Sequence, residues 1–195
     1  SSVCAVLPIR PVTSPWRVNL PLGIAYFEQV HDRVRALPGV QSVGAIQHLP
    51  MSGYNWTSNV WPVERPPASG SERPRATWRF IGWDYFRTME IPLRAGRPFD
   101  ARDHLESPAV AIVNEAFARR EFGDATVAIG RRLATTSGRG DEVVEIVGVS
   151  SDVRYLSLNT PAAPEIYRPL SQTFMFPMAF VVRTTEDPSA LAASV

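Results

Sequence analysis

The chain contains 195 residues, of which 45% are hydrophobic and 20% are charged. This length and composition fit one large globular domain or two small ones, and they exclude a disordered chain. The 20 basic and 19 acidic side chains leave a net charge of +1, which gives no electrostatic basis for binding nucleic acid or an anionic membrane.

Two residue types exclude specific chemistries. All 20 basic residues are arginine and none is lysine, so the chain has no phosphate-loop lysine, Schiff-base lysine or serine–lysine dyad. Cys4 is the single cysteine, which excludes an internal disulfide bond and a multi-cysteine zinc site.

No run of about 20 apolar residues predicts a membrane-spanning helix. Because no leader is visible and the last residues predict an unfinished helix, we expect a piece of a longer protein.

The first 48 residues predict a helix followed by a strand. Residues 1–21 contain four prolines and no acidic residue, so we expect an extended or loosely held segment with a possible strand over 17–20. Apolar residues then recur at helical spacing: Phe27, Val30, Val34 and Leu37. Pro38 and Gly39 end this helix, and residues 40–47 predict a strand.

The middle of the chain predicts many short strands. Residues 49–75 are rich in proline and serine and predict a loop-rich segment. A strand over 77–82, a short helix capped by Asp84 and ending near Met89, and a strand over 91–93 follow.

A strand over 109–113 precedes a helix over 115–122, which Asn114 caps and Gly123 ends. Residues 131–136 and 142–149 predict a hairpin with a five-residue loop. The last predicted strands cover 165–168 and 178–183, and Asp187 with Pro188 begins a final helix.

The densest cluster of carboxylate and imidazole groups comprises Asp100, Asp103, His104 and Glu106. Such a set can bind a divalent cation or perform acid–base catalysis. It is also typical of a capped turn in which Arg97 pairs with a carboxylate. We favour the turn, and we predict no metal, no cofactor and no catalytic residue.

The other polar motifs favour structural roles. His31, His48 and His104 are scattered, and no His-Glu-x-x-His or Gly-x-Ser-x-Gly motif accompanies them. Gly138 and Gly140 lie between two predicted strands, so a turn is favoured over an anion site.

Three aromatic residues in the loop-rich segment, Tyr54, Trp56 and Trp61, have two interpretations. They either present a contact surface to a partner or a sugar, or fold onto the core and hold the loop in place. We favour the second, because large aromatic rings left in water raise the free energy.

Many short motifs follow one another in a fixed order between residues 26 and 195. They include Tyr26-Phe27, 35–40 (RALPGV), Leu49-Pro50, 84–93 (DYFRTMEIPL), 96–99 (GRPF), Asp103, 110–116 (VAIVNEA), Phe122-Gly123, 129–133 (IGRRL), 146–149 (IVGV), 152–154 (DVR), 166–169 (IYRP) and 182–184 (VRT). In this order they resemble the periplasmic core domain of MacB-type ABC-transporter permeases, within the FtsX-like permease family. Residues 124–128 depart from the proline-containing turn that this family usually has.

The resemblance implies an α+β fold with two lobes. Residues 1–48 and 177–195 would form a porter-like α/β lobe, and residues 49–176 an inserted β-rich lobe with short helices. The strand returning after 178–183 would be missing, which predicts an unpaired sheet edge with association through it, or a disordered C-terminus. The structural motif of the family would comprise Gly39, Gly96, Arg97, Asp103 and Gly130, the glycines holding conformations that other residues resist and Arg97 fixing a turn with Asp100 or Asp103.

The resemblance also implies a non-catalytic domain in the periplasm, on the outer side of the cytoplasmic membrane that holds the parent permease. Its role would be to transmit conformational change or to contact cargo during export. The implied partners are the membrane-embedded remainder of the permease, a separate or linked ATP-binding subunit, and a periplasmic adaptor or exported cargo, without nucleic acid. The alternatives are an extracytoplasmic ligand-binding module and, less favoured, a metal-dependent hydrolase that uses Asp100, Asp103 and His104.

Overall fold

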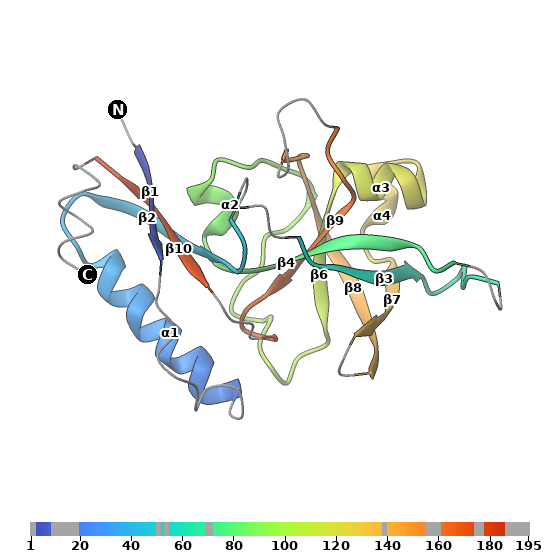
Figure 1. The fold of residues 1–195 in the computed structure, drawn as a ribbon, viewed down its shortest axis with the longest axis horizontal. Helices are drawn as coiled ribbons and strands as arrows, with labels where there is room; N and C mark the ends of the chain where they lie inside the picture. The colour runs from blue at the N-terminus through green and yellow to red at the C-terminus, as the bar shows by residue number, and fades with distance from the viewer. Residues whose placement is uncertain are drawn as a thin grey trace.

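A computed structural model describes residues 3–8, 20–49, 52, 55–68, 72–137, 140–154, 161–173 and 178–185. Within these residues the fold is α+β, as predicted (Figure 1). The strands are β1 Val3–Pro8, β2 Val40–Ile46, β3 Thr57–Pro62, β4 Arg75–Trp83, β5 Leu93–Gly96, β6 Val110–Asn114, β7 Arg132–Ser137, β8 Gly140–Ser150, β9 Glu165–Pro169 and β10 Ala179–Thr184. The helices are α1 Leu20–Arg35, α2 Tyr85–Thr88, α3 Glu115–Phe122 and α4 Ala125–Ala128.

The two ends of the chain meet in one group of antiparallel strands, in the order β1, β10, β2. Successive residues of β10 face opposite sides. On one side the Phe180 ring lies 6.0 Å from the Phe27 ring of α1, and on the other side Val181 packs in a cluster with Tyr85 of α2. Both faces of this group are therefore covered by helices.

The edge of this group of strands does not fall on β10, and the prediction of an unpaired sheet edge stays a prediction. This strand pairs with β2 on one side and with β1 on the other. Residues 3–8, predicted only as extended or loosely held, supply the second partner, which comes from the opposite end of the chain. Of the possible strand over 17–20, Leu20 belongs to α1, and residues 17–19 lie outside the described part. The final helix expected from Asp187 likewise lies outside it.

Six strands in the middle of the chain close into a ring. The pairings run β4, β3, β7, β8, β6 and β9, and β9 returns to pair in parallel with β4. One of these strands, β3, lies inside the segment predicted to be loop-rich, and it pairs with β4 and β7. The division into lobes 1–48 with 177–195 and 49–176 stays a prediction.

Several local signals match the observed elements closely. Helix α3 covers the predicted residues, the Asn114 side chain accepts a hydrogen bond from the Phe117 backbone amide at 3.0 Å, and Gly123 ends the helix with a φ of 82°. Residues 124–128, which depart from the turn usual in the family, contain the short helix α4, which Asp124 caps. The hairpin loop is shorter than predicted, because β7 and β8 extend to Ser137 and Gly140.

No helix within the described ranges is long and apolar enough to cross a membrane.

Candidate functional site: the junction around α2 and the 97–108 loop

The ring of strands and the chain-end strands meet along a short ladder. Strand β2 pairs with β4 through three residue pairs, Gly44 with Trp83, Ala45 with Gly82 and Ile46 with Ile81. The next residues of the chain form α2, so the helix begins where this ladder ends (Figure 1). We call the ladder and α2, residues 44–46 and 81–88, the junction.

Helix α2 packs against both sides of the junction. A Cβ atom at Gly44 would lie 2.5 Å from the Tyr85 Cα atom, so only glycine allows the helix to approach β2 this closely. The Phe86 ring, 7% exposed, lies edge-on to the Tyr167 ring of β9, with the ring centroids 4.9 Å apart. The four-residue helix therefore contacts the chain-end strands and the ring together.

The C-terminal end of α2 is held by a residue from outside the helix, whereas its N-terminal end has no side-chain cap. Asp84 occupies the predicted N-cap position, but its side chain makes no cap hydrogen bond and lies 3.5 Å from Arg87. At the other end, Arg183 of β10 donates two hydrogen bonds to the Thr88 carbonyl oxygen, at 3.0 and 2.8 Å. Because a free helix of four residues is unstable, these contacts and its burial maintain it.

A cleft of about 360 Å³ lies beside the junction, between α1, the end of β4 and the loop after β5. Trp83 lines it with a positive φ of 52°, a conformation that is rare outside glycine and persists only where the surroundings hold it. The His31 ring stacks on the Trp83 ring at 4.5 Å, and the Phe180 ring lies 5.8 Å from Trp83 on the sheet. His31 is 5% exposed, which fits a structural role in this stack.

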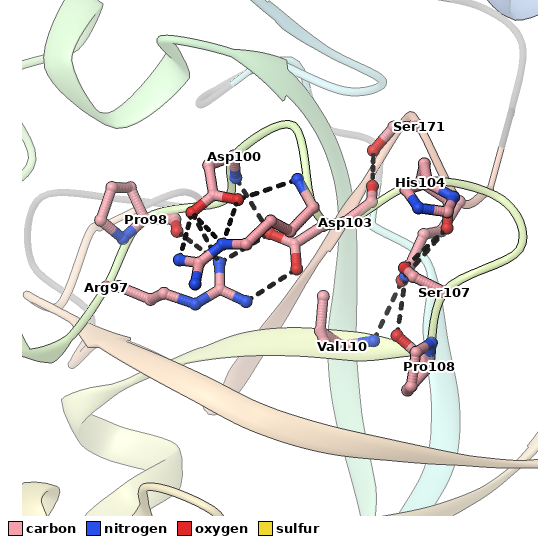
Figure 2. Close-up of polar contacts among 11 residues, drawn as sticks. Arg97, Pro98, Asp100, Asp103, His104, Ser107, Pro108, Val110 and Ser171 are labelled. Carbon is pink, nitrogen blue, oxygen red and sulfur yellow. Dashed lines mark hydrogen bonds and ion pairs between the residues drawn. The ribbon is translucent and has the colours of Figure 1, made fainter.

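The cluster around Arg97 forms a turn after β5 (Figure 2). Arg97 donates two hydrogen bonds to the Asp103 carboxylate, at 2.7 and 2.8 Å, and the Asp100 backbone amide donates a third at 2.9 Å. Asp103 is 3% exposed. Burial alone would raise the pKa of Asp103, but these hydrogen bonds hold it below its ordinary value. Asp100 pairs with Arg102 at 2.7 Å, and this pairing lowers the pKa of Asp100.

The same loop is fixed to the turn that follows β9. Ser171 donates a hydrogen bond to the Asp103 carbonyl oxygen. The Gln172 side chain, 8% exposed, donates to the carbonyl oxygens of His104 and Pro108 and accepts from the Val110 amide at 3.0 Å. These contacts hold the 97–108 loop against the ring.

This geometry leaves the two aspartate carboxylates of the cluster engaged with arginine. Asp100 and Asp103 both face guanidinium groups, and the His104 contacts named above are made by its backbone carbonyl. Among the described residues, no three His, Cys, Asp or Glu side chains lie together in a way that could hold a metal ion. The arrangement is suited to fixing a loop.

The glycines of the predicted motif all have a positive φ, 75° at Gly39, 74° at Gly96 and 78° at Gly130. Gly96 is the most constrained, because a Cβ atom there would collide with the Val147 carbonyl oxygen and would lie 2.8 Å from the Gly148 Cα atom. A residue with a side chain would therefore push β5 away from β8.

Of the aromatic residues predicted to contact a partner, the two that the structure describes, Trp56 and Trp61, pack against different neighbours. The Trp56 ring packs 5.6 Å from the Phe80 ring and stays 36% exposed. Trp61 on β3 is half-buried, with the Arg73 guanidinium 5.3 Å from its ring centroid. Tyr54, Gly138 and Arg139 lie outside the described residues. A role of Trp56 and Trp61 in partner contact stays a prediction.

A buried polar network between β4 and β9 was not predicted. Arg79 and Glu165 are 1% and 2% exposed, and Arg79 Nη2 lies 3.1 Å from Glu165 Oε1. The available signal was Arg79 between Trp78 and Phe80, a charge in a strand with both neighbours aromatic. Finding its partner required the parallel pairing of β4 with β9, which the sequence pattern does not reveal.

Comparison with known proteins gives a consistent result. The family model described as MacB-like periplasmic core domain matches residues 9–195, and no curated protein sequence matches. The periplasmic region of MacB from Actinobacillus actinomycetemcomitans superposes with a TM-score of 0.58 at 16% identity, over 99% of this chain and 79% of that one. The extracellular domain of the noncanonic ABC-type transporter YknZ from Gram-positive bacteria gives 0.54 at 18% identity, over 95% and 84%. A domain of a putative permease protein from Porphyromonas gingivalis gives 0.51 at 17%, over 82% and 69%. At these identities the structures show a shared fold.

Proposed function

Because this chain belongs to the MacB-like periplasmic core domain family, we propose that it transmits conformational change between the membrane helices of an ABC-transporter permease and an outer partner or cargo. Family membership places the domain on the extracytoplasmic side of the cytoplasmic membrane, within a permease. The proposed role is mechanical and uses no catalytic group. An ATP-binding subunit would supply the energy from the other side of the membrane.

The observation that supports this proposal is the position of α2 in the junction. Tyr85 rests against Gly44 of the chain-end strands, and Phe86 rests against Tyr167 of the ring. Apart from this packing, β2 joins β4 through only three residue pairs. A shift of the chain-end strands would therefore push the ring through close-packed side chains, which transmit displacement because protein interiors are hardly compressible.

A matched pair of core variants in the full-length permease tests this role. Phe86→Ala removes the ring that joins α2 to β9, and Leu133→Ala removes a fully buried side chain of β7, away from the junction. Each truncation is expected to lower the free energy of unfolding by about 3 kcal/mol. We expect Phe86→Ala to reduce the amount of cargo moved per ATP hydrolysed, while Leu133→Ala keeps the wild-type ratio.

The measurement is transport and ATP hydrolysis on the same reconstituted permease, at a temperature where both variants stay folded. An unchanged ratio in Phe86→Ala, or an equal loss in Leu133→Ala, would contradict transmission through α2. The first result would mean that the helix only stabilises the fold, and the second that any loss of stability uncouples the permease.

A further inference from the structure

The buried pair Arg79 and Glu165 lies beneath a segment that carries an exposed aromatic residue. Arg79 Nη2 donates to Glu165 Oε1 at 3.1 Å, and the Tyr167 hydroxyl donates to Glu165 Oε2 at 2.8 Å. The same Arg79 nitrogen also donates to Asn55 Oδ1 at 2.9 Å. One guanidinium group therefore joins the buried carboxylate of β9 to the chain just before β3.

Residues 55–56 are attached to β4 by few contacts. Besides the bond between Asn55 and Arg79, the Trp78 backbone amide donates to the Trp56 carbonyl oxygen at 2.8 Å, and the Trp56 ring packs on Phe80. Both residues are exposed. Segments with few buried contacts open at low free energy, so residues 55–56 can detach without unfolding the ring.

The protonation state of Glu165 depends on the charged and polar groups around it and on its shielding from water by residues 55–56. Arg79 faces it from β4, Tyr167 from its own strand and Asp152 from the residues after β8. His48, which follows β2, lies near Arg79, and burial and Arg79 both lower its pKa. Burial raises the pKa of Glu165 to about 7, and Asp152 acts in the same direction, while Arg79 and the Tyr167 hydroxyl act against it.

We propose that Glu165, through Arg79 and Asn55, is a proton-controlled clamp that holds residues 55–56 and the Trp56 side chain against β4. Detachment of this segment would admit water to Glu165. The open form would then bind the proton more weakly than the closed form, so release of the proton favours opening. This inference does not depend on the transmission role.

The direction and size of the effect follow from proton linkage. Glu165 has a pKa of about 7 in the closed form, and in the hydrated open form it takes its ordinary pKa of 4.5. The ratio of open to closed forms therefore rises as the pH increases between these two pKa values, and it levels off above pH 7. Full hydration of Glu165 in the open form gives an increase of up to about 40-fold between pH 5 and pH 7.

Two neighbouring backbone amides of β4, those of Trp78 and Thr77, distinguish detachment of residues 55–56 from a wider opening of the ring in a single experiment. Trp78 donates to Trp56 of the segment, whereas Thr77 donates to the Pro164 carbonyl oxygen beside β9, at 2.9 Å. We expect amide exchange measured by NMR, corrected for the intrinsic pH dependence, to show Trp78 losing protection up to about 40-fold from pH 5 to pH 7. The protection of Thr77 should stay constant. A constant Trp78 value, or a parallel loss at Thr77, would overturn the clamp.

Three variants assign the effect to Glu165. Glu165→Gln should make the protection of Trp78 independent of pH, and a retained pH dependence would contradict the proposal. Glu142→Gln is the matched control, because Glu142 pairs with the buried Arg168 at 2.8 and 3.0 Å but is itself 41% exposed, and it should keep the wild-type profile. Should Glu165→Gln fail to fold, Tyr167→Phe decides. Loss of the hydroxyl removes a group that lowers the pKa of Glu165, so the levelling-off must move to higher pH, and an unmoved profile would refute the clamp.

Discussion

Removal of the Asp103 carboxylate tests how strongly the turn after β5 stabilises the fold. Asp103→Ala deletes both oxygens that accept from Arg97 and leaves the Asp100 amide without its acceptor. Hydrogen bonds to charged groups contribute about 1.5–3 kcal/mol each. The Arg97 side chain is 32% exposed and keeps Asp100 at 3.4 Å, so water and Asp100 offset part of the loss.

The expected net loss in the free energy of unfolding is about 2–3 kcal/mol. For a chain of this length, this corresponds to a decrease in Tm of roughly 4–12 °C. Urea unfolding of Arg97→Ala, Asp103→Ala and the double variant should give an interaction energy above about 1.5 kcal/mol. The control pair is Arg131 and Glu64, whose charged atoms lie 4.0 Å apart with both side chains about half exposed. It should give less than about 0.5 kcal/mol.

The pH dependence adds an independent check. Because the folded-state pKa of Asp103 lies below its ordinary value, its contribution is present above the unfolded-state pKa and is lost as the pH falls through the folded-state pKa. Asp103→Ala should therefore lose less stability than the wild type on acidification below about pH 4. An interaction energy as small as that of the control pair, together with an unchanged acid profile, would refute a stabilising role of this turn.

Two further substitutions test the backbone and the aromatic segment. Gly96→Ala should lower the free energy of unfolding by more than about 1 kcal/mol, because the new Cβ atom meets the Val147 carbonyl oxygen at a positive φ; an unchanged urea midpoint would contradict this. Trp56→Ser should lower Tm by several degrees if the ring mainly holds the segment on Phe80. An unchanged Tm together with lost binding of a periplasmic adaptor or cargo would instead support the contact-surface prediction.

The sequence predicted elements whose signals are local. Helix α3 is bounded by Asn114 and Gly123, and both act within one helical turn of their positions. Gly39, predicted beside Pro38 to end the first helix, lies four residues beyond the last residue of α1 and has a φ of 75°. The turn at Arg97 could also be predicted from the sequence, because its partners Asp100 and Asp103 follow three and six residues later.

Features that depend on distant pairing were not predicted. Strand β1 exists because Val3–Pro8 pairs with Ala179–Thr184 from the other end of the chain. Its single proline, Pro8, and the proline-containing stretch that follows it gave no clear strand signal. Strand β3 is short and contains Ser58 and Asn59, so its strand character comes from its neighbours β4 and β7. Arg79 and Glu165 are 86 residues apart and meet only through the parallel pairing of β4 with β9.

The two halves of β4 have different pairing partners, so one half is held more rigidly than the other. This difference bears on the proposed role. From Thr77 to Ile81 the strand pairs with β9, which closes the ring. Beyond Ile81 its only described pairing is the short ladder to β2, and α2 follows between Trp83 and Glu90, two non-glycine residues with positive φ values of 52° and 54°. A closed ring resists bending because each strand is held on both sides. In the proposed role, relative movement of the chain-end strands would therefore concentrate between residues 81 and 90, where Gly44, Tyr167 and Arg183 all make contact with α2.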